Sequence, residues 1–318
     1  MDFKRILITG ASGFLGSALV DTLLTNHRVF QLIAIYRKHQ PTSRALQMVY
    51  KSDFASDTDY KDALQAISVV IHCTARVHVM HDQSADPLAE FRAVNVEGTL
   101  NLGRQAAAAG VKRFVFISSI KVNGEGTKPG QIYKESDHSD PNDPYGISKF
   151  EAEQGLRQIA ADTGMQVVII RPPLVYGPGV KANFAALMNA VERGWPLPLG
   201  AIHNQRSLVA LDNLVDFIIT CINHPNAANQ TFLVSDGHDL STSELIRTMA
   251  KAAGVPARLI PVPVPMLQLV GRLLGKGDAV QRLCGNLQVD ISKARNLLNW
   301  SPPISVEEGI RRAMMGSV

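Results

Sequence analysis

A glycine-rich turn directly after a short apolar run constrains the fold of this chain more than any other feature. Ile6-Leu7-Ile8 is typical of a buried strand, and Thr9-Gly10-Ala11-Ser12-Gly13-Phe14-Leu15-Gly16 follows it at once. From Phe14 onward the pattern predicts a helix, so the glycines join a strand to a helix N-terminus. The free N–H groups and the positive dipole end of such a helix favour a phosphate. We therefore predict a dinucleotide-binding βα turn.

The three glycines have separate parts in this predicted site. Gly10 permits the tight turn, Gly13 lets the backbone approach a pyrophosphate, and Gly16 lets the helix pack on the strand. Phe14 and Leu15, the first helical residues, complete the predicted cofactor-binding segment. The alternative is a glycine-rich turn without a ligand, which the position at the first strand–helix junction disfavours.

Strand and helix patterns alternate through the first half of the chain. Apolar runs occupy Arg5–Thr9, Gln31–Tyr36, Val69–Cys73, Arg113–Ser118 and Gln166–Arg171, and helical patterns occupy Leu15–Thr25, Tyr60–Ala66, Asp86–Ala109 and Tyr145–Asp162. Short apolar strands separated by helices indicate βαβ units. We predict an α/β fold with a doubly wound parallel sheet of the Rossmann type.

The pattern changes after Arg171, where proline and glycine become frequent. Helical stretches follow at Asn183–Arg193, Leu211–Ile222, Ser243–Ala253 and Ser305–Met315. We predict a dinucleotide-binding domain over residues 1–172 and a smaller, mostly helical substrate lobe over residues 173–318, with part of 206–237 returning to the first domain. The apolar segment Val262–Leu274 is expected to pack in the core or at an interface. A membrane-surface helix is the alternative, disfavoured because the segment is short and carries only Arg272 as a basic anchor.

The composition excludes several classes of protein. The formal net charge is only +4 and the basic residues are scattered, so we expect no nucleic-acid partner. The cysteines Cys73, Cys221 and Cys284 are widely spaced, which predicts reduced thiols and no metal site. No run approaches the ~20 apolar residues of a membrane span. These features predict a soluble, cytoplasmic protein.

The end of the second predicted strand bears on the choice of cofactor. An acidic side chain there would bind the adenosine ribose hydroxyls, but this chain has Ile35-Tyr36-Arg37-Lys38. Arg37 can pair with a 2′-phosphate and Lys38 adds charge, so NADP is favoured and NAD remains the alternative. The other predicted cofactor contacts are Asp53 and Phe54 beside the adenine, and Cys73, Thr74 and Ala75 at a strand end. For Asp53 and Phe54 a surface turn is nearly as plausible.

A tyrosine and a lysine one helical turn apart form the predicted catalytic pair. Asp143-Pro144 is a helix start, because Asp caps and Pro suits the first helical position. Tyr145 and Lys149 then lie on one helix face. An ammonium beside a phenol lowers the pKa of the phenol towards a useful acid–base range, and Lys149 can also bind the nicotinamide ribose. Ser119, at the end of a predicted strand, would hold a substrate oxygen against Tyr145.

Together these motifs resemble the extended short-chain dehydrogenases/reductases, in particular the NAD(P)-dependent nucleotide-sugar epimerases and dehydratases. The resemblance spans nearly the whole chain and rests on the glycine loop, His72–Ala75, Asn95–Thr99, Phe116–Ser119, Tyr145–Lys149, Arg171–Pro178, Arg206–Val209 with Asp212, and Asp290–Arg295 with Leu298–Trp300. It implies that Tyr145 is the acid/base, Lys149 its modulator and Ser119 the substrate-oxygen donor.

The resemblance also implies further contacts and an assembly. Pro172 would border the nicotinamide, Asn183, Phe184 and Arg206 would hold a nucleotide diphosphate, and the stretch with Val77 and His78 would line a sugar pocket. Members often form homodimers through the tyrosine-bearing helix and its neighbour, so a homodimer is expected.

Departures from the family pattern narrow the reaction. Dehydratases of this group need an acid pair just after the serine, but Ile120-Lys121-Val122 stands there, so dehydration is disfavoured. The resemblance then implies action at C4 of a UDP-hexose, by 4-epimerisation or by 4-keto reduction, in bacterial surface-polysaccharide synthesis. Arg37 favours reduction with NADPH. The alternatives are an NADPH-dependent reductase of a non-nucleotide ketone, of the steroid or flavanonol type, and a non-catalytic dinucleotide-sensing module.

Overall fold

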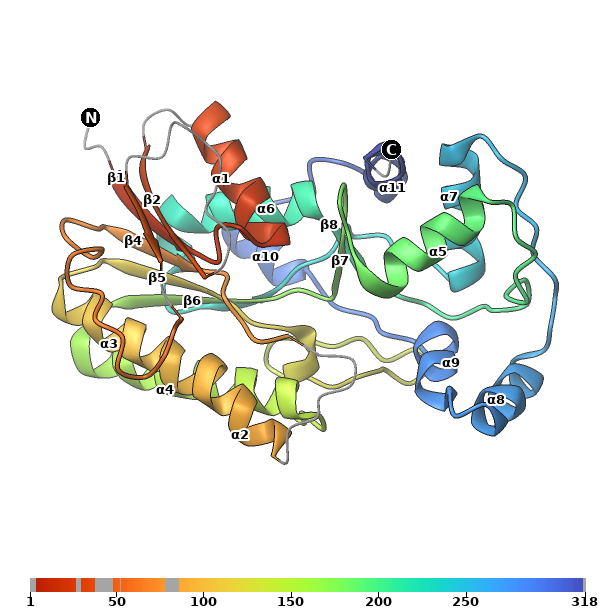
Figure 1. The fold of residues 1–318 in the computed structure, drawn as a ribbon, viewed down its shortest axis with the longest axis horizontal. Helices are drawn as coiled ribbons and strands as arrows, with labels where there is room; N and C mark the ends of the chain where they lie inside the picture. The colour runs from red at the N-terminus through yellow and green to blue at the C-terminus, as the bar shows by residue number, and fades with distance from the viewer. Residues whose placement is uncertain (1–3, 27–29, 38–47, 52, 78–85, 317–318) are drawn as a thin grey trace.

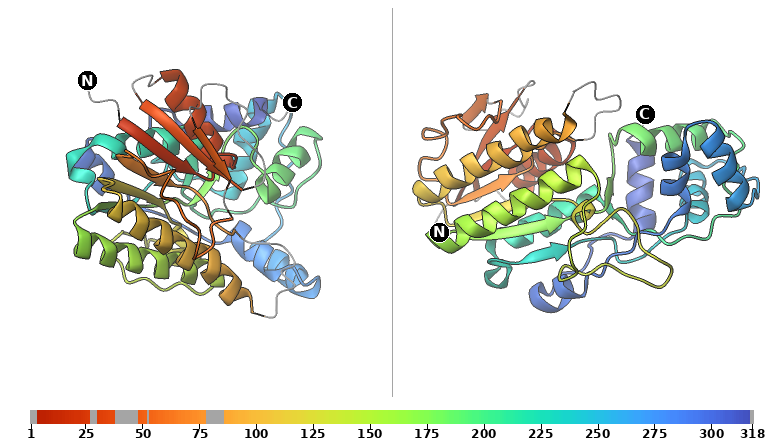
Figure 2. Two further views of the ribbon diagram at one scale, coloured as in Figure 1. Left: turned by 60° about the vertical axis from the view of Figure 1, so that its left-hand side comes forward. Right: turned by 90° about the horizontal axis from the view of Figure 1, so that it is seen from below.

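The computed structural model describes residues 4–26, 30–37, 48–51, 53–77 and 86–316 of the chain. Two predicted site residues, Lys38 and His78, lie outside these ranges. The chain forms a three-layered lobe around a parallel sheet, called here the sheet lobe, with a second lobe at one end of that sheet (Figure 1). The right-hand view of Figure 2 shows this second, helical lobe beyond the end of the strands. The predicted fold class is confirmed.

The main sheet has seven strands in the order β3-β2-β1-β4-β5-β6-β9, and every neighbouring pair is parallel. Its strands are β1 (Lys4–Thr9), β2 (Phe30–Tyr36), β3 (Met48–Lys51), β4 (Val69–His72), β5 (Arg113–Ile117), β6 (Gln166–Arg171) and β9 (Thr231–Leu233). The order reverses beside β1, because β2 lies on one side of it and β4 on the other. Ligands bind at such a switch point in open α/β sheets.

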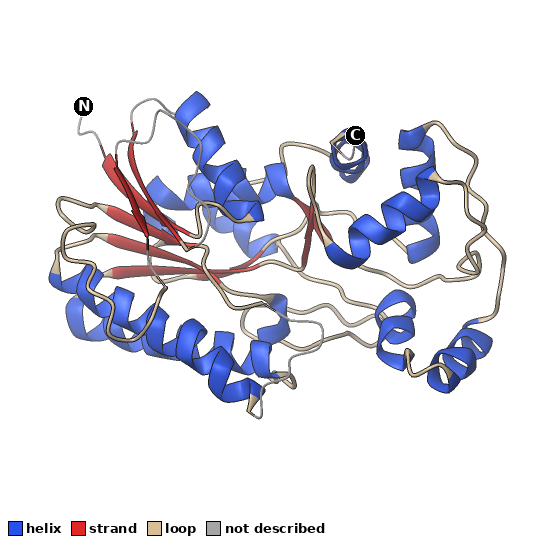
Figure 3. Ribbon diagram, in the orientation of Figure 1, coloured by secondary structure: helices blue, strands red, loops and turns tan. Residues whose placement is uncertain are grey.

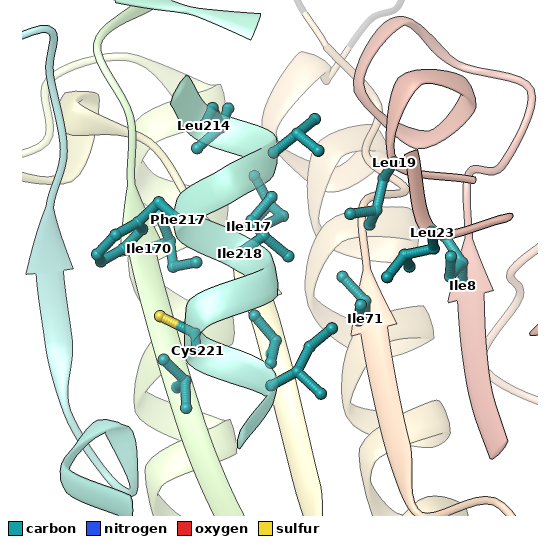
Figure 4. Packing of buried hydrophobic residues seen from close by; sticks show 14 of the residues in the cluster. Ile8, Leu19, Leu23, Ile71, Ile117, Ile170, Leu214, Phe217, Ile218 and Cys221 are labelled. Carbon is teal, nitrogen blue, oxygen red and sulfur yellow. The ribbon is translucent and has the colours of Figure 1, made fainter. Parts of the chain in front are cut away.

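Helices cover both faces of the main sheet (Figure 3). The helices α1 (Phe14–Asn26) and α6 (Leu211–Asn223) lie on one face, and α2 (Pro87–Arg92), the π-helical turn η1 (Ala93–Gly98), α3 (Thr99–Ala108) and α4 (Pro144–Thr163) lie on the other. Each face of the sheet has its own hydrophobic core, and buried strand residues alternate between them. Ile8 packs towards α1 on one face, and Leu7 packs towards α3 and α4 on the other. Figure 4 shows Phe217 and Ile218 of α6 packed over the strands.

The helical lobe has a core of its own. It contains the two-stranded parallel sheet of β7 (Leu174–Tyr176) and β8 (Leu208–Ala210), with α5 (Ala182–Glu192), α7 (Thr242–Ala253) and α11 (Val306–Met315) around it. Between these elements the chain returns to the sheet lobe three times. It does so as α6, as β9 at the sheet edge, and as α10 (Ser292–Leu298), whose Ala294 and Leu298 join the α6 core.

Most of the predicted elements are found within a residue or two, and the differences have physical causes. The segment Tyr60–Ala66 forms turns instead of a helix, with Tyr60, Ala63 and Leu64 buried. The predicted helix Asp86–Ala109 is divided by η1, where Asn95 turns inward to bind the backbone of Arg76. The short strands β3, β7, β8 and β9 were not predicted, because runs of three or four residues carry little periodicity.

The apolar segment Val262–Leu274 packs against the core of the helical lobe along one side only, through Val264 and Leu267. It forms α8 (Val264–Leu273), in which Gly271 is buried. Beside it lies α9 (Gly277–Cys284). No helix within the described ranges is long and apolar enough to cross a membrane.

Gly98 provides a test of the η1 packing. A Cβ at this position would lie well inside van der Waals distance of the Phe54 carbonyl oxygen, which is backbone and cannot rotate away. We expect Gly98→Ala to lower the free energy of unfolding by about 2 kcal/mol, the usual cost of overpacking. The measurement is urea unfolding, with Gly277→Ala as the matched control, since a Cβ there meets no atom closer than 3.9 Å. Equal stability of the two variants would contradict the described packing.

Candidate active site

The glycine turn leaves the N-terminal end of α1 open and its own backbone close-packed. Gly10 has φ of +67°, a conformation that suits glycine, and its carbonyl accepts from the Gly13 N–H at 2.8 Å. A Cβ on Gly16 would collide with the Gly10 carbonyl oxygen, and one on Gly10 would lie 3.0 Å from the Thr74 nitrogen. The turn therefore tolerates no side chain at Gly10 or Gly16, as expected of a backbone cradle for a pyrophosphate.

The strand end beside this turn supplies an unsatisfied polar atom. The Thr74 Oγ1 is buried and has no hydrogen-bond partner among the described residues. Cys73, Thr74 and Ala75 are half-buried and follow β4 directly. His72 is different, since Thr9 and Thr99 hydroxyls occupy both ring nitrogens at 2.7 and 3.0 Å. Burial lowers the pKa of His72 to about 3, so it is a structural histidine. The cradle and the orphaned hydroxyl fit a dinucleotide.

The residues predicted to contact the adenosine part of the cofactor lie in three different environments. Arg37 is exposed at the end of β2. The Asp53 carboxylate accepts from the Ala55 N–H at 3.3 Å and the Thr58 hydroxyl at 3.0 Å, which lowers its pKa. Phe54 is buried in the α3–α4 core, 6.2 Å from the His72 ring. The contact of these side chains with a cofactor stays a prediction.

The helix α4 places Tyr145 and Lys149 as the sequence predicts. Asp143 caps it by accepting from the Tyr145 and Gly146 N–H groups, and Gly164 ends it with φ of +74°. Lys149 is buried, donates to the Ile117 carbonyl at 2.7 Å and lies 4.3 Å from the centre of the Phe116 ring. The ammonium is therefore held at the carboxyl end of β5.

The electrostatics of Tyr145 differ from the sequence prediction. Burial, and then the negative charge of Asp143, raise its pKa to about 12, although a hydrogen bond from Ser119 opposes the change. Lys149 was expected to lower this pKa, and that expectation is wrong, because the ammonium donates to the Ile117 carbonyl. Burial also lowers the pKa of Lys149 itself to about 7, against the attraction of Glu153. The Tyr145 hydroxyl is hydrogen-bonded to Ser119, and the predicted contact of Ser119 with a substrate oxygen stays a prediction.

A buried carboxylate missed by the sequence analysis holds these groups in place. Glu153, one turn after Lys149, is fully buried and accepts two hydrogen bonds from Arg171, at 2.9 and 2.6 Å. The same carboxylate accepts from the Ser118 hydroxyl, beside Ser119, at 2.5 Å. The spacing Tyr145, Lys149, Glu153 repeats every four residues, and this repeat was the available signal.

A cleft of about 1020 Å³ opens between the lobes, with Tyr145 in its wall. Arg206 lines it from the helical lobe and donates to the Gly285 carbonyl at 3.1 Å. Burial, and then the neighbouring Arg282, lower the pKa of Arg206. Arg282, which the sequence analysis missed, also lines the cleft from α9. Two neighbouring guanidinium groups opposite a phenol suit an anionic ligand that ends at Tyr145.

Several residues predicted at the substrate lie elsewhere or at the margin. Asn183 is exposed at the start of α5, and Phe184 is buried against Tyr176 at 5.4 Å between ring centres. Neither is among the residues lining the cleft. Pro172 is buried after β6 and its carbonyl accepts from the Ile120 N–H, whereas Val77 is exposed. The structure thus places Ser119 against Tyr145, Lys149 one turn further along α4, and Arg206 in the wall of the same cleft as Tyr145.

Replacement of Lys149 by Met tests the electrostatics of the site. The unfolded chain keeps the lysine proton up to its ordinary pKa of 10.5, whereas the folded protein releases it near 7. Wild-type stability therefore gains with rising pH between about 7 and 10, and the variant lacks this gain. We expect the unfolding free energy of Lys149→Met minus that of wild type to fall across this window, as measured by urea unfolding without cofactor. A difference independent of pH would contradict the buried ammonium.

Comparisons with known proteins agree on the kind of protein to which this chain is similar. A family model described as the NAD dependent epimerase/dehydratase family matches residues 6–235. A UDP-glucose 4-epimerase of Vibrio cholerae is 51% identical over 310 residues, which cover 97% of this chain and 94% of that protein. The fold is similar to a Thermotoga maritima UDP-glucose 4-epimerase with UDP-glucose, at a TM-score of 0.77 and 24% identity, covering 98% of each chain. The fold is also similar to a Bacillus cereus UDP-glucuronic acid 4-epimerase in complex with NAD, at a TM-score of 0.78 and 22% identity, covering 98% of each chain.

Proposed function

Because the chain belongs to the NAD-dependent epimerase/dehydratase family of extended short-chain dehydrogenases/reductases, we propose that it is the enzyme that inverts C4 of a UDP-hexose. The observation that supports this most directly is the cleft that joins Tyr145 to Arg206 and Arg282. A UDP-hexose has its diphosphate in the middle, between the uridine and a hexose that carries a secondary alcohol at C4. The basic side chains bind the diphosphate and the phenol serves the alcohol.

The cofactor is a dinucleotide of the NAD(P) type, and the residues of the first βα junction fit it. The turn around Gly10 and Gly13 and the free N–H groups of α1 would hold the pyrophosphate, with Thr74 alongside. Lys149 would hold the nicotinamide ribose. When bound, the nicotinamide supplies hydride acceptance and return at the sugar carbon.

Tyr145 moves the proton of the C4 hydroxyl in this mechanism. With a pKa of about 12 in the protein as it stands, the phenol is protonated at neutral pH and is ready to donate to a C4 carbonyl oxygen. Ser119 would hold that oxygen, because its hydrogen bond to the phenol places its hydroxyl next to Tyr145. Removal of a proton from a C4 hydroxyl requires the phenolate, which positive charge brought near by the bound cofactor and Lys149 would stabilise.

A second candidate, the reduction of a 4-keto-UDP-hexose with NADPH, is favoured by one specific feature. The exposed Arg37 stands where an acidic side chain would otherwise select NAD, and Asp53 is engaged in its own loop. A reductase of this kind uses the same Tyr145 and Ser119 but consumes one cofactor per sugar. The two candidates therefore differ in stoichiometry and not in the proton-transfer site.

The experiment is turnover of UDP-glucose with each cofactor, with products resolved by chromatography. We expect UDP-galactose to form with no net consumption of cofactor. Tyr145→Phe should lower turnover by about 10³-fold or more, because it removes the acid/base proton. Dinucleotide binding, followed by fluorescence, should be unchanged in this variant.

Two results would overturn these assignments. Oxidation of one NADPH per 4-keto sugar, without interconversion of UDP-hexoses, would replace epimerisation by reduction. Wild-type turnover in Tyr145→Phe would remove the phenol from the mechanism.

Binding of UDP tests the nucleotide part of the proposal separately. We expect UDP to raise the melting temperature, and Arg206→Gln to weaken UDP binding about 10-fold or more, since a charge-assisted pair to phosphate is lost. Arg247→Gln is the matched control, because Arg247 is exposed on α7 and lies outside the cleft lining. Equal UDP affinities of the two variants would exclude the assigned diphosphate site.

A further inference from the structure

The outer face of α8 is an exposed apolar surface. Met266, Leu269, Val270 and Leu273 recur at the spacing of one helix face, and they are between 50% and 78% exposed. Leu274, directly after the helix, is 66% exposed. We call these five residues the α8 face. Scattered single apolar residues on a surface need no explanation, but a contiguous stripe of this length indicates a binding partner.

The inner side of the same helix is well packed, so the exposed face has a fixed orientation. Gly271 is buried, and a Cβ there would lie 2.6 Å from Val280 of α9. Leu267 and Leu283 are half-buried against the core of the helical lobe. The helix is thus held to α9 on one side and presents its apolar side chains on the other. Figure 1 shows α8 and α9 together at the edge of the helical lobe.

The charges around the α8 face are mostly positive. Between residues 256 and 285 the chain has four basic residues and one acidic residue, Asp278. The basic residues are Arg258, Arg272, Lys276 and Arg282, and all four are exposed. A net charge of +3 in this segment accounts for most of the +4 of the whole chain. Arg272 on α8 and Lys276 just after it are the cations next to the apolar stripe, whereas Arg282 lines the cleft.

We propose that the α8 face docks on a membrane surface rich in anionic lipid. An apolar helix face bordered by Lys and Arg is the pattern of helices that lie in the bilayer interface, and the ten residues of α8 are too few to span it. A second copy of the chain fits this face less well, because symmetric pairing would bring two positively charged segments together. Anionic headgroups complement both the charge and the apolar stripe.

Docking in this orientation places the cleft close to the lipid. Asp278, Gln281 and Arg282 of α9, the helix that supports α8, line the cleft that contains Tyr145. The protein would therefore work at the membrane surface, with the cleft mouth beside the headgroups. This inference does not depend on the reaction assigned above.

The test is co-sedimentation of the full chain with vesicles. One vesicle set contains one part phosphatidylglycerol to two parts phosphatidylcholine, and the other contains phosphatidylcholine alone. We expect binding to the anionic vesicles, weakened by salt, and weak binding to the neutral ones. Leu269→Gln/Leu273→Gln should lower the affinity for anionic vesicles about 10-fold or more, because two apolar side chains no longer enter the interface.

A matched control and a charge variant distinguish docking on anionic lipid from nonspecific apolar binding and from pairing of two copies. Met315→Gln removes a 65% exposed apolar side chain on α11 and should bind vesicles as wild type does. Arg272→Glu/Lys276→Glu should abolish the preference for anionic lipid. No binding of wild type to anionic vesicles would overturn the proposal. So would an α8-face variant that binds vesicles normally but loses a dimer by light scattering, since the face would then join two copies.

Discussion

A single buried carboxylate connects the elements that carry the proposed catalytic side chains. Glu153 belongs to α4, two turns after Tyr145, and it bonds Arg171 at the end of β6 and Ser118 at the end of β5. Arg171 also donates to Asn123 at 2.9 Å, which anchors the loop after Ser119. A buried ion pair of this kind adds little net stability over an apolar core, but the loss of one partner leaves an uncompensated charge. Its value here is positional, since it fixes α4 against two strand ends.

The burial that orders the site also disfavours the charged forms of Tyr145 and Lys149. Lys149 is buried between β5 and α4, and its pKa falls to about 7. The pKa of Tyr145 rises to about 12 for the same physical reason. Added positive charge near this site would favour the phenolate of Tyr145 and would disfavour the ammonium of Lys149.

The sequence predicts well what is local and repeated, and poorly what depends on distant packing. The turn around Gly10 and the pair Tyr145 and Lys149 could be predicted because capping, glycine geometry and helical spacing are short-range. Glu153 was missed, because its importance comes from Arg171, a partner on another strand. Arg282 was missed because α9 reaches the cleft only through the fold.

For the α8 segment, too, the sequence could not predict what depends on distant packing. Its apolar composition predicted burial, yet composition cannot tell a core-facing stripe from one left at the surface. Only the position of Gly271 against α9 decides which side of the helix is inward. The direction of the Lys149 ammonium towards the Ile117 carbonyl could likewise not be read from spacing.

The chain passes several times between the sheet lobe and the helical lobe. After β6 the chain enters the helical lobe, returns as α6, leaves, returns as β9, leaves, returns as α10 and ends in α11. Trp300, after α10, donates to Asp216 of α6 at 2.8 Å and closes the last return. No single cut therefore yields two fragments that each retain a whole core. The lobes are interlaced by covalent connectivity, so genetic excision of either one would remove strands or helices that the other needs.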